Sequence, residues 1–139
     1  MLHFVFITFF VHMCMVITYD IISHSILDSK IVKLMLNPQL DQGLKLMKSI
    51  NSYYNLLDDI DTKLRDPRER FVALKNLKEI VNYNGPKFVN ITCDIDLFKI
   101  AFMWNNEDIM EFKKVVESVK NKWQDLLELL SNIETHVIS

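Results

Sequence analysis

The last third of the chain carries apolar side chains at alternating intervals of three and four residues. These positions are Ile109, Phe112, Val116, Val119, Trp123, Leu126, Leu130, Ile133 and Val137. An α-helix places such positions on one face, whereas a half-buried β-strand needs an apolar residue at every second position. Charged residues such as Glu107 and Lys114 fall on the opposite face. The spacing therefore predicts a long C-terminal amphipathic helix.

The helix that covers this apolar face can belong to the same chain or to a second copy. A repeat sustained over several heptads is typical of coiled coils, which carry charges at the flanking positions. Here the flanking positions hold Val115, Leu127 and Leu129, which widen the apolar stripe. A wide stripe is typical of a helix that packs against several neighbours. We expect an internal bundle, with a dimeric coiled coil as the alternative.

Residues with helix-ending and helix-starting preferences divide the rest of the chain. Asn37-Pro38 and Asp66-Pro67-Arg68-Glu69 indicate helix starts, because Asn or Asp can cap and Pro fits the first helical position. Asn84-Gly85-Pro86 indicates a stop, since Gly readily adopts the left-handed conformation that ends a helix. Further starts are indicated at Thr92 or Asp94 and at Asn105. The heptad spacing also continues backwards across that last start, through Asn105, Phe102, Phe98 and Ile95.

Apolar residues recur at helical spacing between these boundaries. The apolar residues of a helix expected over residues 20–36 are Leu27, Ile31 and Leu34. Those of the second helix are Leu40, Leu44, Met47, Ile50, Tyr54, Leu57, Ile60 and Leu64. Those of the third are Phe71, Leu74, Leu77 and Val81. The chain has only two glycines and three prolines, too few for the many tight turns of an all-β fold. We predict an all-α fold, a four- to five-helix bundle that ends in the long C-terminal helix.

The first eighteen residues, MLHFVFITFFVHMCMVIT, contain no charged side chain. A secretory signal has an apolar core of about 7–15 residues, and a membrane-spanning helix needs about 20. We predict a signal peptide over residues 1–18, a helical bundle domain over residues 19–139, and a secreted, extracellular protein. The alternatives are an uncleaved signal anchor and a buried helix of a cytosolic fold.

Cleavage of this signal would remove Cys14 and leave Cys93 as the one thiol of the mature chain. One thiol cannot form an internal disulfide, so the apolar core must hold the domain together. Cys93 is expected to be a buried, inert side chain. Its alternative role is an intermolecular disulfide in a homodimer.

The triplet Asn90-Ile91-Thr92 has the pattern of an N-glycosylation site. It follows the predicted stop at Asn84-Gly85-Pro86 and is expected in an exposed loop, where an acceptor asparagine must lie. We therefore predict a glycoprotein modified at Asn90.

The charge balance argues against nucleic acid as a partner. The formal net charge is −2, whereas nucleic-acid binding depends on an excess of Lys and Arg that neutralises phosphates. The segment 63–87 is mainly basic and residues 88–139 are mainly acidic, which favours their packing side by side. The alternative is a basic patch for an acidic partner, formed by Lys63, Arg65, Arg68 and Arg70.

No motif with catalytic or metal-binding chemistry is evident. His24 and His136 lie at opposite ends of the mature chain, without metal-ligand spacing, and are expected to be solvated. Phosphate-binding loops need clustered glycines, and the two glycines are isolated. The run Asp58-Asp59-Ile60-Asp61 has Thr62 where a magnesium-binding Asp-Asp-x-x-Asp motif needs its last Asp. We expect no enzyme activity, no metal and no cofactor.

Aromatic side chains are frequent in the C-terminal part, at Phe98, Phe102, Trp104, Phe112 and Trp123. They are expected to pack in the core. The alternative is a cavity for a lipid or another apolar ligand, lined by these rings and by Met35, Met47, Met103 and Met110. Some residues lie off the main apolar face and need a second surface that buries them; they are Ile100, Met103, Trp104 and Met110.

Secretion, compact helices and missing catalytic groups leave recognition as the expected function. We expect a non-enzymatic protein that acts through protein–protein interaction outside the producing cell. The first alternative is an extracellular carrier of a small apolar ligand. The second is a signal-anchored membrane protein with a helical ectodomain.

Overall fold

The structure is a computed structural model that describes residues 7–8 and 23–138. The predicted signal peptide, residues 1–18, and its membrane-anchor alternative therefore lie almost entirely outside the described residues. None of the described helices combines the length and the apolar character needed to cross a lipid bilayer.

All regular secondary structure in the described part of the chain is helical. A first helix is seen over residues 23–36. It is followed by α2 (Gly43–Arg65), α3 (Arg70–Asn82), the short 3-10 helix η1 (Lys87–Asn90), α4 (Ile95–Phe102) and α5 (Asn106–Ile138). The prediction of an all-α bundle with a long C-terminal helix is confirmed.

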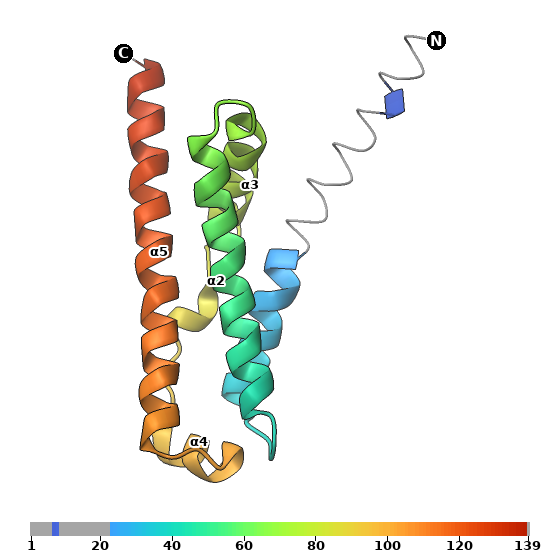
Figure 1. The fold of residues 1–139 in the computed structure, drawn as a ribbon, viewed down its shortest axis with the longest axis vertical. Helices are drawn as coiled ribbons and strands as arrows, with labels where there is room; N and C mark the ends of the chain where they lie inside the picture. Colours follow the sequence, from blue (N-terminus) through green and yellow to red (C-terminus); the bar gives the residue numbers. More distant parts are fainter. Residues whose placement is uncertain (1–6, 9–22, 139) are drawn as a thin grey trace.

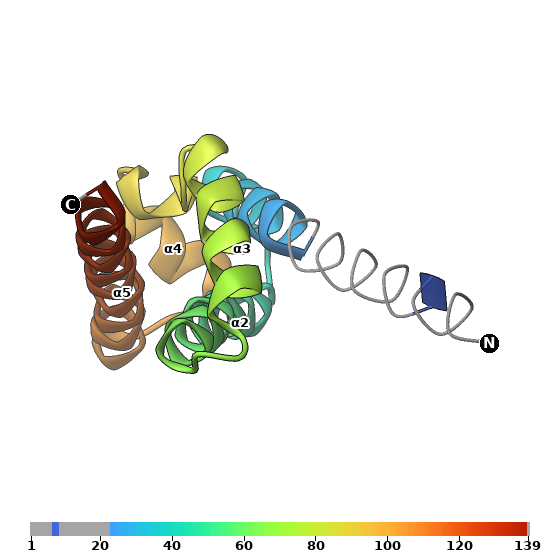
Figure 2. The same cartoon turned by 90° about the horizontal axis from the view of Figure 1, so that it is seen from above.

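Helices α2 and α5 form the long axis of the molecule (Figure 1). Helix α3 packs against both, and η1 contacts α5. Seen from above, α5 lies on one side and the helix over residues 23–36 on the other, with α2 and α3 between them (Figure 2). The short helix α4 crosses the end of the molecule where α2 and α5 begin (Figure 1). This end therefore brings the start of α2 together with α4 and α5, which lie much later in the sequence.

The apolar face of α5 is covered by the same chain. Ile109, Phe112, Val119 and Leu126 are buried in the core, and so is the flanking residue Val115. Leu129, a second flanking residue, is partly buried, whereas the third, Leu127, is exposed. The apolar face therefore packs inside the bundle, as expected, but the stripe is narrower at Leu127. The heptad register before Asn105 does not continue the same helix, because Met103 takes a left-handed conformation (φ 56°) that ends α4.

Two predicted helix starts are capped as expected. Asp94 caps α4, since its Oδ1 accepts a hydrogen bond from the Leu97 N–H at 3.0 Å. Asn105 and Asp108 cap α5 reciprocally, each side chain accepting from the other's backbone N–H at 2.9 Å. Gly85 has a φ of 64°, which confirms its left-handed role after α3.

The two proline-based starts are wrong by several residues. Helix α2 begins at Gly43 and not after Asn37, and Asp41 takes a positive φ of 61° in the intervening turn. Helix α3 begins at Arg70, because Asp66 closes a separate turn by accepting a hydrogen bond from the Arg68 N–H at 3.0 Å. In that turn the side chain is satisfied locally and does not cap the helix.

The predicted apolar stripes of α2 and α3 are correct toward their C-terminal ends only. Leu40, Leu44 and Phe71 are exposed, whereas Leu46 and Tyr53, which were not assigned to the stripe, are fully buried. Gly43 explains the orientation of the first turn of α2. A Cβ at this position would lie only 2.4 Å from Nε1 of Trp104, so only glycine allows α2 to pack this closely against the indole ring. With Gly43 turned toward Trp104, the next residue, Leu44, points away from the core.

Candidate functional site

Three large apolar side chains around α4 remain exposed to solvent. Ile100 is 76% exposed, Met103 72% and Met110 70%. Helix α4 has only eight residues, and it buries Phe98 and Phe102 one turn apart on one face. Ile100 lies on the opposite face and therefore points away from the core. All three lie off the main apolar face, where their positions in the sequence predict a second surface that buries them.

Further exposed leucines lie at the same end of the molecule. Leu40 and Leu44 flank the start of α2, which packs against Trp104 through Gly43. We call this surface the apolar end; its exposed side chains are Leu40, Leu44, Leu97, Ile100, Met103 and Met110. Isolated exposed apolar residues are common, but several on adjoining elements are typical of interaction surfaces.

The aromatic rings beneath the apolar end pack on one another. The Trp104 ring lies 4.8 Å from Phe102, 5.6 Å from Phe112 and 6.0 Å from Phe98, measured between centroids. Phe98 and Phe112 meet edge to face at 5.5 Å. These are ordinary spacings for aromatic pairs in a core. The arrangement supports core packing over a ligand cavity lined by these rings, and it provides a rigid base for the exposed side chains.

Cys93 lies half-buried beside an open groove of about 400 Å³. Its thiol donates a weak hydrogen bond to the carbonyl oxygen of Ile91, and burial raises the pKa of the thiol. The groove is lined by Met35, Ile91, Cys93, Ile95, Phe112, Lys113, Val116 and Glu117. A raised pKa keeps the thiol protonated and less reactive, which suits the expected inert role. The intermolecular disulfide stays a prediction.

Asn90 is the last residue of η1, and its side chain is exposed. Thr92, the third residue of the triplet, is exposed as well. The geometry is thus open to a glycosylating enzyme, and glycosylation of Asn90 stays a prediction.

The expectation that His24 is solvated is wrong. Its side chain is only 2% exposed and shares a hydrogen bond with the Tyr53 hydroxyl. Burial lowers the pKa of His24 to about 4, so the imidazole is neutral at pH 7. Tyr53 lies 29 positions away in the sequence, and no local pattern indicates the pairing. His136 is exposed, as expected.

A second buried polar contact joins the helix over residues 23–36 to η1. Asp28 Oδ1 accepts hydrogen bonds from the backbone N–H groups of Lys87 and Phe88, at 3.0 Å and 3.3 Å. Burial raises the pKa of Asp28, and these hydrogen bonds oppose the rise. Together with His24 and Tyr53, this carboxylate fixes the helix over residues 23–36 onto α2 and η1. Its surroundings indicate a structural role.

The acidic run on α2 is paired with cations. Lys122 of α5 lies 3.0 Å from a carboxylate oxygen of Asp58 and 3.2 Å from one of Asp61. Asp59 pairs with Lys63 at 2.8 Å. Within residues 7–8 and 23–138, no group of three or more His, Cys, Asp or Glu side chains is arranged to hold a metal ion.

The predicted basic patch is engaged in local interactions. Lys63 pairs with Asp59, Arg65 with Asp61 at 3.1 Å, and Arg68 contacts Asp66 at 3.5 Å. Arg70 donates a hydrogen bond from Nε to the Leu64 carbonyl oxygen. These contacts weaken the case for an acidic partner at this site. The ion pair Lys78–Glu134, at 3.2 Å, joins the basic segment to the acidic one.

Comparisons with protein-family models, with curated proteins and with solved structures find no match to this chain.

Proposed function

We propose that this chain is a secreted, non-enzymatic protein that acts outside the producing cell by binding another protein through the apolar end. The observation that carries the proposal is the exposure of Ile100 on the short helix α4 and of Met103 directly after it, while the other face of α4 is anchored in the aromatic core. The charge-free leader, residues 1–18, supports secretion.

The chemistry of the apolar end suits a protein partner. Leucine, isoleucine and methionine offer apolar area without fixed hydrogen-bond directions, and methionine adapts its shape to the surface that it meets. Removing such side chains from water drives association, and a rigid base lowers the entropy that is lost on binding. The matching partner surface is apolar at its centre.

A pair of charge-matched variants tests this proposal. Ile100→Glu with Met103→Glu places two charges on the apolar end. The control is Phe71→Glu with Tyr83→Glu, which changes two exposed apolar residues of α3 and the turn after it. Chemical crosslinking to proteins from candidate target tissue, read by mass spectrometry, identifies partners of the unmodified chain.

We expect a specific partner that the apolar-end variant loses and the α3 control retains. A partner that the apolar-end variant holds as well as the unmodified chain would refute binding at this surface. Circular dichroism of both variants shows whether the helices are intact. A crosslinked homodimer lost in the same variant would identify a second copy as the partner.

The carrier function is a second candidate, supported by the groove beside Cys93. Its apolar lining includes Met35, Ile95 and Val116 and surrounds about 400 Å³, enough for part of an acyl chain. Native mass spectrometry of protein from its natural source tests this candidate. A co-purifying apolar molecule would support it. A bare chain that also leaves the fluorescence of a fatty-acid probe unchanged would exclude it.

The membrane-anchored alternative depends on residues outside the described part of the chain. N-terminal sequencing of the protein as it exists outside cells distinguishes the two forms. A start after residue 18 supports cleavage and secretion, and a start at Met1 contradicts the signal peptide.

A further inference from the structure

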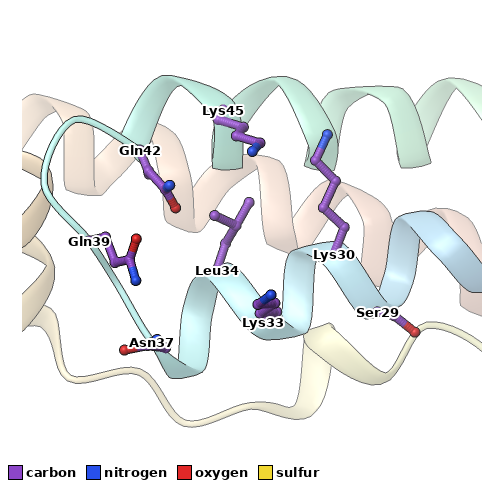
Figure 3. A pocket seen from close by; sticks show the side chains of 8 residues that line it. All are labelled: Ser29, Lys30, Lys33, Leu34, Asn37, Gln39, Gln42 and Lys45. Carbon is purple, nitrogen blue, oxygen red and sulfur yellow. The ribbon is translucent and has the colours of Figure 1, made fainter.

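Four lysines line a groove between the helix over residues 23–36 and α2. Lys30 and Lys33 come from the first helix, and Lys45 and Lys48 come from α2. In Figure 3, Lys30 extends toward α2 and Lys45 extends from α2 into the same space. Two spacings of three residues, one on each helix, bring these side chains to the same side of the molecule.

The groove has two adjoining parts that share Lys30 and Lys45. One part encloses about 450 Å³ and the other about 410 Å³. Leu34 and the polar side chains Ser29, Asn37, Gln39 and Gln42 complete the first part. Their amide and hydroxyl groups can donate and accept hydrogen bonds. An elongated ligand with several anionic groups fits this arrangement better than a single ion.

The positive charge of the groove is not balanced by nearby carboxylates. No acidic side chain lines its first part, and Asp41 is the one acid of its second part. None of the four lysines forms an ion pair with a residue that the structure describes. The basic residues 63, 65 and 68, by contrast, all pair with Asp. In a chain of net charge −2, such a local excess of lysine creates a distinct anion-attracting field.

We propose that this groove binds a sulfated glycan, with the four lysines contacting sulfate groups and the amide side chains contacting sugar hydroxyls. Lysine ammonium groups bind sulfate and phosphate oxygens as point charges. The lining contains no aromatic side chain, so it lacks the stacking surface that single-stranded nucleic acids and nucleotides use. A narrow polysaccharide chain can enter a groove, whereas the flat surface of a membrane cannot. The groove adjoins the apolar end at Leu44, which lines its second part, but none of the four lysines belongs to the apolar end. The proposal does not depend on a protein partner.

Binding of a heparin octasaccharide to the purified chain, measured by isothermal titration calorimetry at low salt, tests this proposal. Lys30→Gln with Lys45→Gln removes the two lysines that both parts share. Lys75→Gln with Lys120→Gln removes the same charge from exposed positions on α3 and α5 and serves as the control. We expect the groove variant to lose about tenfold or more in affinity and the control to stay within about twofold.

The expected binding weakens as salt is added and disappears with the desulfated octasaccharide. Lys33→Gln with Lys48→Gln provides a second groove variant if the first does not fold, and the same loss is expected. A parallel titration with vesicles that contain phosphatidylserine tests a membrane as the alternative ligand. The proposal would be overturned if the sulfated probe did not bind, or if the groove and control variants lost the same affinity. It would also be overturned if the chain bound only to the vesicles. The last result would identify the groove as a membrane-contact surface.

Discussion

At the scale of single residues, the side chains of His24, Tyr53 and Asp28 are the most constrained polar groups. Burial raises the pKa of Tyr53, and the nearby carboxylate of Asp28 adds to the rise, so the hydroxyl stays protonated. A neutral imidazole can share a hydrogen bond with this hydroxyl at little desolvation cost, whereas an imidazolium buried at the same place would be costly. The pairing therefore links stability to pH.

We predict that the chain loses stability as the pH falls from 6.5 toward 4. The pKa of His24 is about 4 in the folded chain and 6.5 in its ordinary state, so the unfolded chain takes up a proton first. A difference of this size corresponds to about 3 kcal/mol across the whole range. Asp28 acts in the opposite sense, because its raised pKa lets the folded chain bind a proton above 3.8.

Urea unfolding at pH 7 and pH 5 measures this effect, and the His24→Gln variant isolates the contribution of His24. His24→Gln should have a lower stability at pH 7 and a smaller change between the two pH values. His136→Gln, at an exposed position, should keep the pH dependence of the unmodified chain. An unchanged pH dependence in His24→Gln would contradict the assignment.

A second prediction at this scale concerns Gly43. Replacing Gly by Ala inside a helix ordinarily stabilises it by about 0.5–1 kcal/mol. Here the added Cβ would lie 2.4 Å from Trp104 Nε1 and 2.9 Å from the Phe102 Cβ. We expect Gly43→Ala to destabilise the fold by about 1–3 kcal/mol, through overpacking.

Thermal unfolding followed by circular dichroism measures this change. The tryptophan fluorescence of the chain should shift with it, because the indole of Trp104 must move. A stabilised Gly43→Ala chain would show that α2 does not pack against Trp104 as described.

At the scale of helices, the sequence predicts an element well when the determining residues lie within it. The α5 stripe and the helix start at Asn105 are local patterns, and both are correct as far as Ile133, since the side chain of Val137 lies outside the described residues. Of the two starts indicated for α4, Thr92 and Asp94, the structure uses Asp94. The starts at Asn37-Pro38 and Asp66-Pro67 failed because each residue also fits a turn before the helix. Propensity alone cannot choose between these two uses.

The candidate sites, too, could be predicted where local sequence determines them and not where packing between helices does. Ile100 and Met103 could be recognised because they lie off the apolar stripe. The lysine groove could not, since Lys30 and Lys33 meet Lys45 and Lys48 only after two helices pack together. His24 was misjudged for the same reason, because its partner Tyr53 comes from another helix.

Lys122 connects α5 to α2, and its loss should weaken the contact between these helices. Its side chain is mostly buried and reaches Asp58 and Asp61, and the hydrogen bond to Asp58 is the main cause that raises the pKa of Lys122. Lys122→Met should lower the free energy of unfolding by about 1–2 kcal/mol, because both carboxylates lose their cation.

Urea denaturation measures this loss, with Lys120→Met as a control at an exposed position of the same helix. The control should change the free energy of unfolding by less than about 0.5 kcal/mol. Equal effects of the two substitutions would show that the bridge adds nothing to the packing of α5 on α2.

At the scale of the whole molecule, one chain covers the apolar face of its own longest helix. Packing of α2, α3 and η1 against α5 leaves no need for a second copy to form the core. The surfaces proposed for partners, the apolar end around α4 and the lysine groove between the first helix and α2, lie outside this core. This account of the two surfaces requires that the apolar face of α5 is covered by other helices of the same chain.

The dependence of thermal unfolding on protein concentration tests this central claim most directly. A core completed within one chain has a midpoint temperature that stays constant over roughly a hundredfold range of concentration. We predict this result for the unmodified chain and for the apolar-end variant Ile100→Glu with Met103→Glu. A midpoint that rises with concentration in both would contradict the account, because the apolar face of α5 would then be covered by a second copy.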